Sequence, residues 1–312
     1  MSTARNIPND RGLSLRMFIT GLMLVLLYAV VIGLLIAVGI SYAVVLVFAG
    51  AIIFVQYWFS DKIALFGMGG RLVTPEEAPQ LHGAIDRLCA MADMKKPKVA
   101  IADSDVPNAF ATGRSPNSAV VCATTGLMRR LDESELEAVL AHELSHVAHR
   151  DVAVMTIASF LGMVAGMVTR MMFWTGMMGG FGGGRDNNDN QSGNQTVLIE
   201  MAVLVVSVAV YAISFLLTMA LSRYRELAAD RAGAILTGQP SALASALVKV
   251  TGEIARIPTR DLRTTETFNA FYFTPAIAKG GVSVSTLFST HPSLDKRLAQ
   301  LAELEAEMGR PS

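Results

Sequence analysis

An uninterrupted run of uncharged residues constrains the fold more than any other feature of this sequence. No Asp, Glu, Lys or Arg occurs from Met17 to Ser60, a stretch of 44 residues. Roughly 20 apolar residues of helix cross the hydrocarbon core of a bilayer. The run is therefore long enough for two membrane spans with a tight turn near Gly39 and Ser41. It is much longer than the apolar region of a cleaved signal peptide, so we predict a transmembrane helical hairpin.

Two further uncharged runs follow in the middle of the chain. Residues 152–169 form a run of 18 and residues 201–222 a run of 22. The second is long enough to span a membrane, whereas the first is marginal unless Arg170 reaches an interface. A Gly/Asn-rich segment, 179–194, lies between them and is typical of a flexible surface loop.

Composition agrees with a membrane protein and excludes one class of partner. Hydrophobic residues make up 52% of the chain, the mean hydropathy is +0.44 and charged residues make up 17%, against about 25% in soluble domains. The 26 Lys and Arg residues balance 26 Asp and Glu residues, so nucleic acid is not an expected partner. The two cysteines, Cys89 and Cys122, are expected to be buried apolar residues.

Charges beside the predicted spans indicate their orientation. Three arginines precede the first span, Lys62 and Arg71 follow the second, and the turn between the spans carries no charge. Lys and Arg concentrate on the cytoplasmic side of membrane proteins. Both termini and the segments 61–150 and 223–312 are therefore predicted to be cytoplasmic, with the loop around Arg185 on the other side.

The segment after the hairpin favours mixed α and β structure. Apolar spacing predicts a helix over 75–95, and short strands are predicted at 98–102 and 118–124. An irregular or edge-strand passage, 105–113, lies between the strands. A further helix begins near Asp132, which can cap it together with Glu135.

That further helix carries a pattern with chemical meaning. Residues 142–146 read His-Glu-Leu-Ser-His, an H-E-x-x-H motif. Positions four apart share one face of a helix, so the imidazoles of His142 and His146 can converge on one ion. Neutral imidazoles suit Zn²⁺, and Glu143 can take a proton from a water molecule that the metal activates. The motif predicts a metal-dependent hydrolase.

A catalytic zinc needs a third protein ligand, which must come from elsewhere in the chain. An extended H-E-x-x-H-x-x-G-x-x-H motif would place a histidine at position 152, where the chain has Val152. Glu226 is the best carboxylate, and Asp230, one helical turn later, can accept the outer N–H of a ligating histidine. The alternative is that both belong to a solvated, salt-bridged helix face. His82 and His291 are the only histidines outside the local cluster at 142–149.

Four motifs in order resemble one known family. HELSH at 142–146, SRYRELAAD at 222–230, NAFATG at 108–113 and THP at 290–292 are together similar to the HtpX family of membrane zinc metalloproteases, which are related to the CaaX prenyl endopeptidases. The resemblance implies a gluzincin with one Zn²⁺ per chain. It implies that His142, His146 and Glu226 bind the metal and that Glu143 is the general base.

The resemblance also implies a substrate site and a biological setting. Asn108, Ala109, Phe110 and Ala111 would form an edge strand on which substrate adds as a β-strand. His291 would donate to the oxyanion, unless it is only a loop or capping residue, and Arg297 would orient a carboxylate. The expected role is cleavage of damaged or misfolded membrane proteins in stress-response quality control at the plasma (cell inner) membrane. A homo-oligomer or quality-control partners remain open.

The expected fold is a mainly α membrane protein with transmembrane hairpins and an α+β zincin-like domain containing a small edge-strand sheet. We predict four regions: a tail and hairpin, 1–60; the first part of the protease domain, 61–151; two apolar segments, 152–222; and the second part of that domain, 223–312. Two alternatives are an intramembrane metalloprotease, disfavoured by charges flanking the motif, and a non-catalytic metal-binding membrane adaptor, disfavoured because no motif residue is lost.

Overall fold

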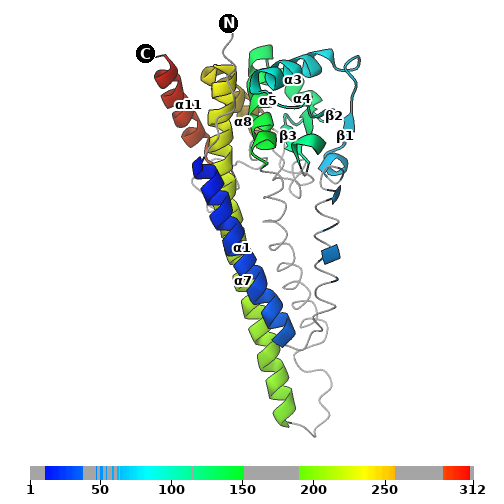
Figure 1. Ribbon diagram of the computed structural model, residues 1–312, viewed down its shortest axis with the longest axis vertical. Coiled ribbons are helices and arrows are strands. Elements are labelled where there is room, and N and C mark those ends of the chain that lie inside the picture. The colour runs from blue at the N-terminus through cyan, green and yellow to red at the C-terminus, as the bar shows by residue number, and fades with distance from the viewer. Residues whose placement is uncertain are drawn as a thin grey trace. The chain divides into compact units, whose positions relative to one another are not determined.

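The computed structural model describes residues 11–37, separate positions between 47 and 62, and 64–113, 115–150, 190–256 and 291–309. The chain divides into two compact units. One comprises Met1–Leu15, Tyr57–Val154 and Met219–Ser312, and the other comprises Arg16–Gln56 and Met155–Thr218. Figure 1 colours the elements by their order in the chain, from blue at the N-terminus to red at the C-terminus.

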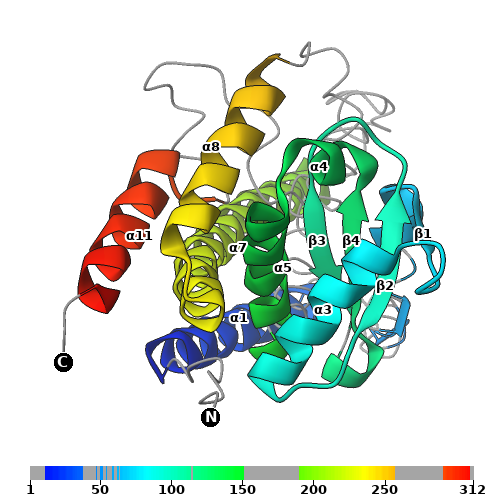
Figure 2. The same cartoon turned by 90° about the horizontal axis from the view of Figure 1, so that it is seen from above.

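A four-stranded sheet organises the first unit. Its strands are β1 (Gly70–Leu72), β2 (Lys98–Ala102), β3 (Ala109–Thr112) and β4 (Val120–Thr124), in the order β1-β2-β4-β3. β2 and β4 are parallel, while β1 and β3 run antiparallel to their neighbours. β3 therefore forms one edge of the sheet, as Figure 2 shows.

Apolar side chains cover both faces of this sheet, which explains why the strands are almost continuously apolar. Helices α3 (Pro79–Ala92) and α5 (Glu133–Ala148) share one core with Val99 and Val121. On the opposite face, Phe110 and Cys122 pack with residues 64–68. Both cysteines are buried, and burial raises the pKa of Cys89 to about 11 and that of Cys122 to about 12.

Helix α5 is fixed at its start and along one side. The side chain of Asp132 accepts a hydrogen bond from the backbone of Glu135, and Glu135 accepts one from the backbone of Asp132, which is the predicted capping box. Helix α8 (Pro240–Arg256) packs against α5 and against α11 (Leu294–Met308). Two residues of α8 also bind buried Glu135, through Ser245 Oγ at 2.6 Å and Lys249 Nζ at 2.5 Å.

The short elements complete the first unit. Helix α4 (Thr125–Arg130) follows β4, and Thr124 caps it by accepting a hydrogen bond from Leu127 N. A 3-10 turn, η1 (Pro116–Ser118), leads into β4. The predicted strands and the helix over 75–95 are thus present as β2, β4 and α3, and the edge-strand passage contains β3. The predicted α+β class with a small sheet is confirmed.

The second unit contains parts of two helices, α1 (Arg11–Ala37) and α7 (Asn190–Thr237). Leu24 of α1 and Val210 of α7 are buried together. Within the described ranges, no helix combines the length and apolar character required to cross a bilayer. The predicted turn near Gly39 and the run 152–169 lie outside those ranges, so the transmembrane hairpins stay a prediction.

Candidate metal centre

Helix α5 brings together the three polar residues of the H-E-x-x-H motif in a buried position. His142, Glu143 and His146 are 1%, 4% and 6% exposed. The Nε2 atoms of the two histidines are 3.3 Å apart, and their rings meet edge to face. Because they are four residues apart on one helix, both imidazoles point to the same side.

Helix α7 supplies the carboxylate that completes this cluster. Glu226 Oε2 lies 3.7 Å from His142 Nε2, and Oε1 lies 3.5 Å from His146 Nε2. In a tetrahedral site with bonds of 2.0–2.1 Å, ligand atoms are about 3.3 Å apart. The donor atoms of these three residues all lie within 4.8 Å of one another and form a candidate metal-binding group. The set predicted from the sequence therefore fits a single ion.

Two further buried charges hold His142 in place. His142 Nδ1 lies 2.9 Å from Asp230 Oδ1. Asp230 in turn accepts two hydrogen bonds from Arg297 of α11, at 2.6 and 2.7 Å. A histidine that donates Nδ1–H to a carboxylate presents the lone pair of Nε2 to a metal. Burial opposes ionisation of Asp230, but the charge of Arg297 outweighs this and lowers the pKa of Asp230.

Electrostatics distinguish the two glutamates of the centre. Burial alone would raise the pKa of Glu226, but the charge of His291 and the contacts with His142 and His146 hold it well below its ordinary value. Burial raises the pKa of Glu143, and the nearby histidines only partly offset this. These surroundings thus favour the ionised form of Glu226 and increase the proton affinity of Glu143.

The edge strand β3 fixes one oxygen of Glu143. Glu143 Oε2 accepts a hydrogen bond of 2.9 Å from Ala111 N. Asn108, just before β3, is bonded through its backbone to Thr124. Main-chain bonding alternates along an antiparallel strand, so Ala109 and Ala111 direct their backbone groups away from β4. The four predicted edge-strand residues therefore lie at the sheet edge beside the base, with Phe110 directed to the opposite face.

His291 lies against a proposed ligand. Its Nδ1 is 3.2 Å from Glu226 Oε2, and the side chain is buried. The other two histidines have structural contacts: His82 Nε2 with Val73 O at 3.1 Å, and His149 Nδ1 with Ser145 O at 2.8 Å.

The alternative of a solvated helix face does not hold for the part of α7 around the site. Glu226 and Asp230 are buried, whereas Arg231 is half exposed. Arg225 of the same helix is only 8% exposed, and its Nη2 lies 3.5 Å from His146 Nδ1. In the sequence, only its position immediately before Glu226 could have indicated that Arg225 lies at the site.

A glycine sets the approach of α7 to α5. A Cβ on Gly233 would lie 2.8 Å from His142 N and 3.1 Å from His142 Cα. We expect Gly233→Ala to push the helices apart, to destabilise the fold by about 1–3 kcal/mol and to weaken metal binding.

Gly252→Ala in α8 is the matched control, since nothing lies within 4 Å of a Cβ added there. This variant should stabilise the fold by about 0.5–1 kcal/mol. Thermal unfolding and metal titration measure both effects. Equal thermal stability and equal metal affinity of Gly233→Ala and Gly252→Ala would contradict the packing role of Gly233.

Asp230 offers a second test of the arrangement. Asp230→Asn retains the size of the side chain but removes the charge that pairs with Arg297 and His142. Loss of such an outer hydrogen-bond partner typically lowers metal affinity by about 10–100-fold, and we expect this loss in competition with a chromogenic chelator. Asp295→Asn, in the exposed first turn of α11, is the control. Unchanged affinity in Asp230→Asn would show that the contact does not support the metal site.

Two histidines on one helix with a glutamate between them, together with a carboxylate from a second helix, are the residue pattern typical of metallopeptidase sites. Residues 75–305 match peptidase family M48, and the chain belongs to this family. It is accordingly a membrane metalloprotease that uses a metal ion. The resemblance drawn from the four sequence motifs is confirmed.

Two curated protease relatives agree with this assignment over nearly the full chain. Protease HtpX homolog 1 of Streptomyces coelicolor is 58% identical over 301 residues, which cover 96% of this chain and 95% of the relative. Protease HtpX homolog of Moorella thermoacetica is 52% identical over 304 residues, 97% of this chain and 98% of the relative. The crystal structure of S. mikatae Ste24p aligns with a TM-score of 0.46 and 17% identity, covering 94% of this chain and 66% of that one.

Proposed function

We propose that this protein is a zinc-dependent endopeptidase in which His142, His146 and Glu226 bind one Zn²⁺. The observation that carries the proposal is the spacing of the three donor groups, 3.3, 3.5 and 3.7 Å between facing atoms. Two imidazoles and a carboxylate are the donor types of many catalytic zinc sites, which leave a fourth position open.

Four polar residues around the proposed ligands have roles in peptide hydrolysis: Glu143, His291, Asp230 and Arg297. A bound zinc ion would supply Lewis-acid chemistry, polarising the scissile carbonyl and lowering the pKa of water. Glu143, oriented by Ala111 N–H, takes a proton from the attacking water and delivers it to the leaving amine. His291 donates a hydrogen bond to the oxyanion through Nε2, since Nδ1 faces Glu226. Asp230 and Arg297 hold His142 in the tautomer that binds metal.

The substrate adds to β3 as an extended strand. Ala109 directs its N–H and C=O outward at the sheet edge, and Ala111, whose N–H is bonded to Glu143, directs its C=O outward. A peptide can pair with these main-chain groups regardless of its side chains. This form of recognition suits unfolded segments. The substrates we propose are therefore damaged or misfolded membrane proteins.

The membrane setting we propose is a multi-pass protein of the plasma (cell inner) membrane with its active centre and both termini in the cytoplasm. Large apolar side chains on α1 are exposed, including Phe18 at 68% and Val25 at 61%. Val205 of α7 is 61% exposed. Exposed apolar surface of this kind indicates contact with lipid or other protein, and the charge distribution around the predicted spans indicates their orientation.

The experiment is digestion of an unfolded membrane protein by detergent-purified enzyme. We expect internal cleavage products, identified by mass spectrometry, that disappear after metal removal and return when zinc is added. Stoichiometric zinc binding without cleavage of any unfolded substrate would instead support the adaptor alternative.

A further inference from the structure

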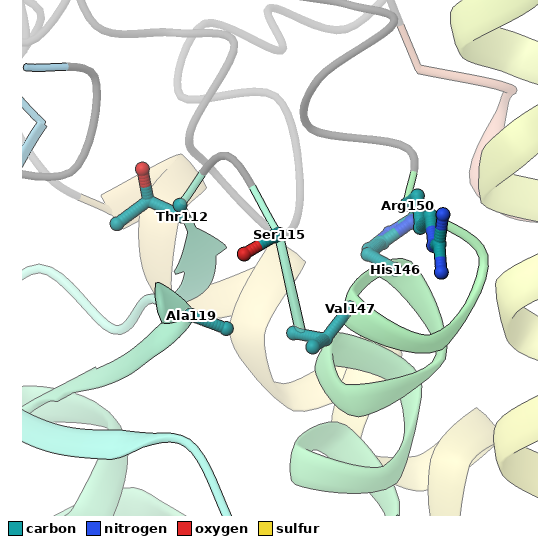
Figure 3. Close-up of a pocket in the computed structure, with 7 residues that line it drawn as sticks. Thr112, Ser115, Ala119, His146, Val147 and Arg150 are labelled. Carbon is teal, nitrogen blue, oxygen red and sulfur yellow. The ribbon is translucent and has the colours of Figure 1, made fainter. Parts of the chain in front are cut away.

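A small hollow lies beside the proposed active centre, between the end of β3 and the last turn of α5. Figure 3 shows its lining, and the hollow is open on one side, with room for little more than one methyl-sized group. Pockets for separate small molecules are much larger, about 300–1,000 Å³, so this one has room for one short side chain at most. Its lining residues are Thr112, Gly113, Ser115, Ala119, His146, Val147 and Arg150.

The position of the hollow along β3 relates it to the scissile bond. Ala111 contacts the proposed base Glu143, and the next two residues, Thr112 and Gly113, form the wall of the hollow beside His146. A peptide paired with β3 would therefore place a side chain in the hollow one or two residues away from the bond next to Glu143.

The direction of the peptide decides which side of the bond that residue occupies. Antiparallel pairing is slightly more stable per residue than parallel pairing. An antiparallel peptide runs opposite to β3, so the part facing Thr112 and Gly113 precedes the part facing Ala111. The residue in the hollow is then N-terminal to the scissile bond.

The walls select for a short side chain without a positive charge. Ala119 and Val147 are buried, and Figure 3 shows them facing the hollow from opposite sides. Ser115 Oγ is bonded to Ser118 Oγ at 3.0 Å, so its hydroxyl is already engaged. Arg150 adds a positive charge that disfavours Lys and Arg.

A close backbone contact makes one wall rigid. Gly113 has φ +123°, and a Cβ there would lie 2.7 Å from Ser118 O and 2.8 Å from Ala119 Cα. The wall formed by Gly113 and Ala119 therefore has little room to move apart or to take a larger residue.

We propose that this hollow is a specificity pocket for a short side chain without a positive charge, such as Ala or Ser, in the first or second position before the scissile bond. The inference rests on the proposed peptidase function and specifies its substrate class. A misfitting methylene or larger group in a pocket typically changes kcat/KM by about 10-fold or more.

The experiment uses full-length, zinc-loaded enzyme in detergent and peptides that differ only at those two positions. We expect wild type to prefer Ala over Leu or Lys by about 10-fold in kcat/KM. Val147→Ala should widen the pocket and shift the Ala/Leu ratio toward Leu by about fivefold or more, whereas Ala119→Val should shift it toward Ala. Val139→Ala, the same change in the core of the same helix, should leave the ratio at the wild-type value.

The outcomes separate the pocket from the function on which it rests. If Val147→Ala and Ala119→Val cleave the peptides with the wild-type Ala/Leu ratio of kcat/KM, the pocket proposal alone is overturned. A wild-type preference for Leu, Lys or Glu overturns it as well. A preference located only C-terminal to the bond overturns the direction of binding. No cleavage of any peptide overturns the proposed function, and the pocket with it. If Ala119→Val does not fold, comparing the Ala/Leu ratios of Val147→Ala and Val139→Ala still tests the pocket.

Discussion

Glu143→Gln is expected to lower peptide-bond hydrolysis by about 10²–10⁴-fold, the usual contribution of a general base, while zinc stays bound. The amide oxygen of Gln can still accept the hydrogen bond from Ala111 N, so the geometry of the centre should be retained. The group that takes the proton is lost, because an amide has no comparable basicity. Turnover of an unfolded substrate and zinc content per chain measure the two effects.

Glu137→Gln is the matched control for this variant. Glu137 lies on the same helix and pairs with Arg87 at 3.3 Å on the partly exposed side, where such pairs contribute about 0–1 kcal/mol. We expect activity close to wild type. Zinc-bound Glu143→Gln that keeps more than a tenth of the activity would exclude Glu143 as the general base.

Glu226→Gln is expected to weaken zinc binding by at least about 100-fold, more than the loss of an outer hydrogen-bond partner usually costs. The carboxylate is the only charged donor of the set, and its buried site lies among His142, His146 and His291. Activity should fall in parallel at limiting zinc and recover partly at high zinc concentration. Equilibrium competition with a chelator of known affinity gives the dissociation constant.

The control for Glu226→Gln is Glu307→Gln. Glu307 is half exposed and lies 3.7 Å from Arg231, away from the donor atoms. The zinc affinity of Glu307→Gln should equal that of wild type. Full zinc affinity in Glu226→Gln would mean that the third ligand is another residue.

Local spacing predicted the parts of the site that one helix can define. His142 and His146 face one side because they are four residues apart, and Glu226 and Asp230 do so for the same reason. Asp132 and Glu135 predicted the start of α5 through a capping box, which the structure confirms. These predictions depend only on helix geometry and nearby residues.

Contacts between distant segments were beyond such reasoning. The hydrogen bond from Ala111 to Glu143 joins residues 32 positions apart, and the one between Arg297 and Asp230 joins residues 67 apart. Most arginines are exposed to solvent, and the burial of Arg225 depends on how α7 packs on α5. The contact of Gly233 with His142 depends on the same packing. No periodicity in the sequence specifies how closely two helices approach.

The most direct test of the account is the zinc-edge anomalous signal from crystals of the zinc-loaded protein. We predict one peak per chain, with two imidazole nitrogens at about 2.0–2.1 Å and one carboxylate oxygen at about 2.0–2.2 Å, from His142, His146 and Glu226. A peak coordinated by other residues, or no peak in protein that contains stoichiometric zinc and cleaves peptides, would contradict the central claim.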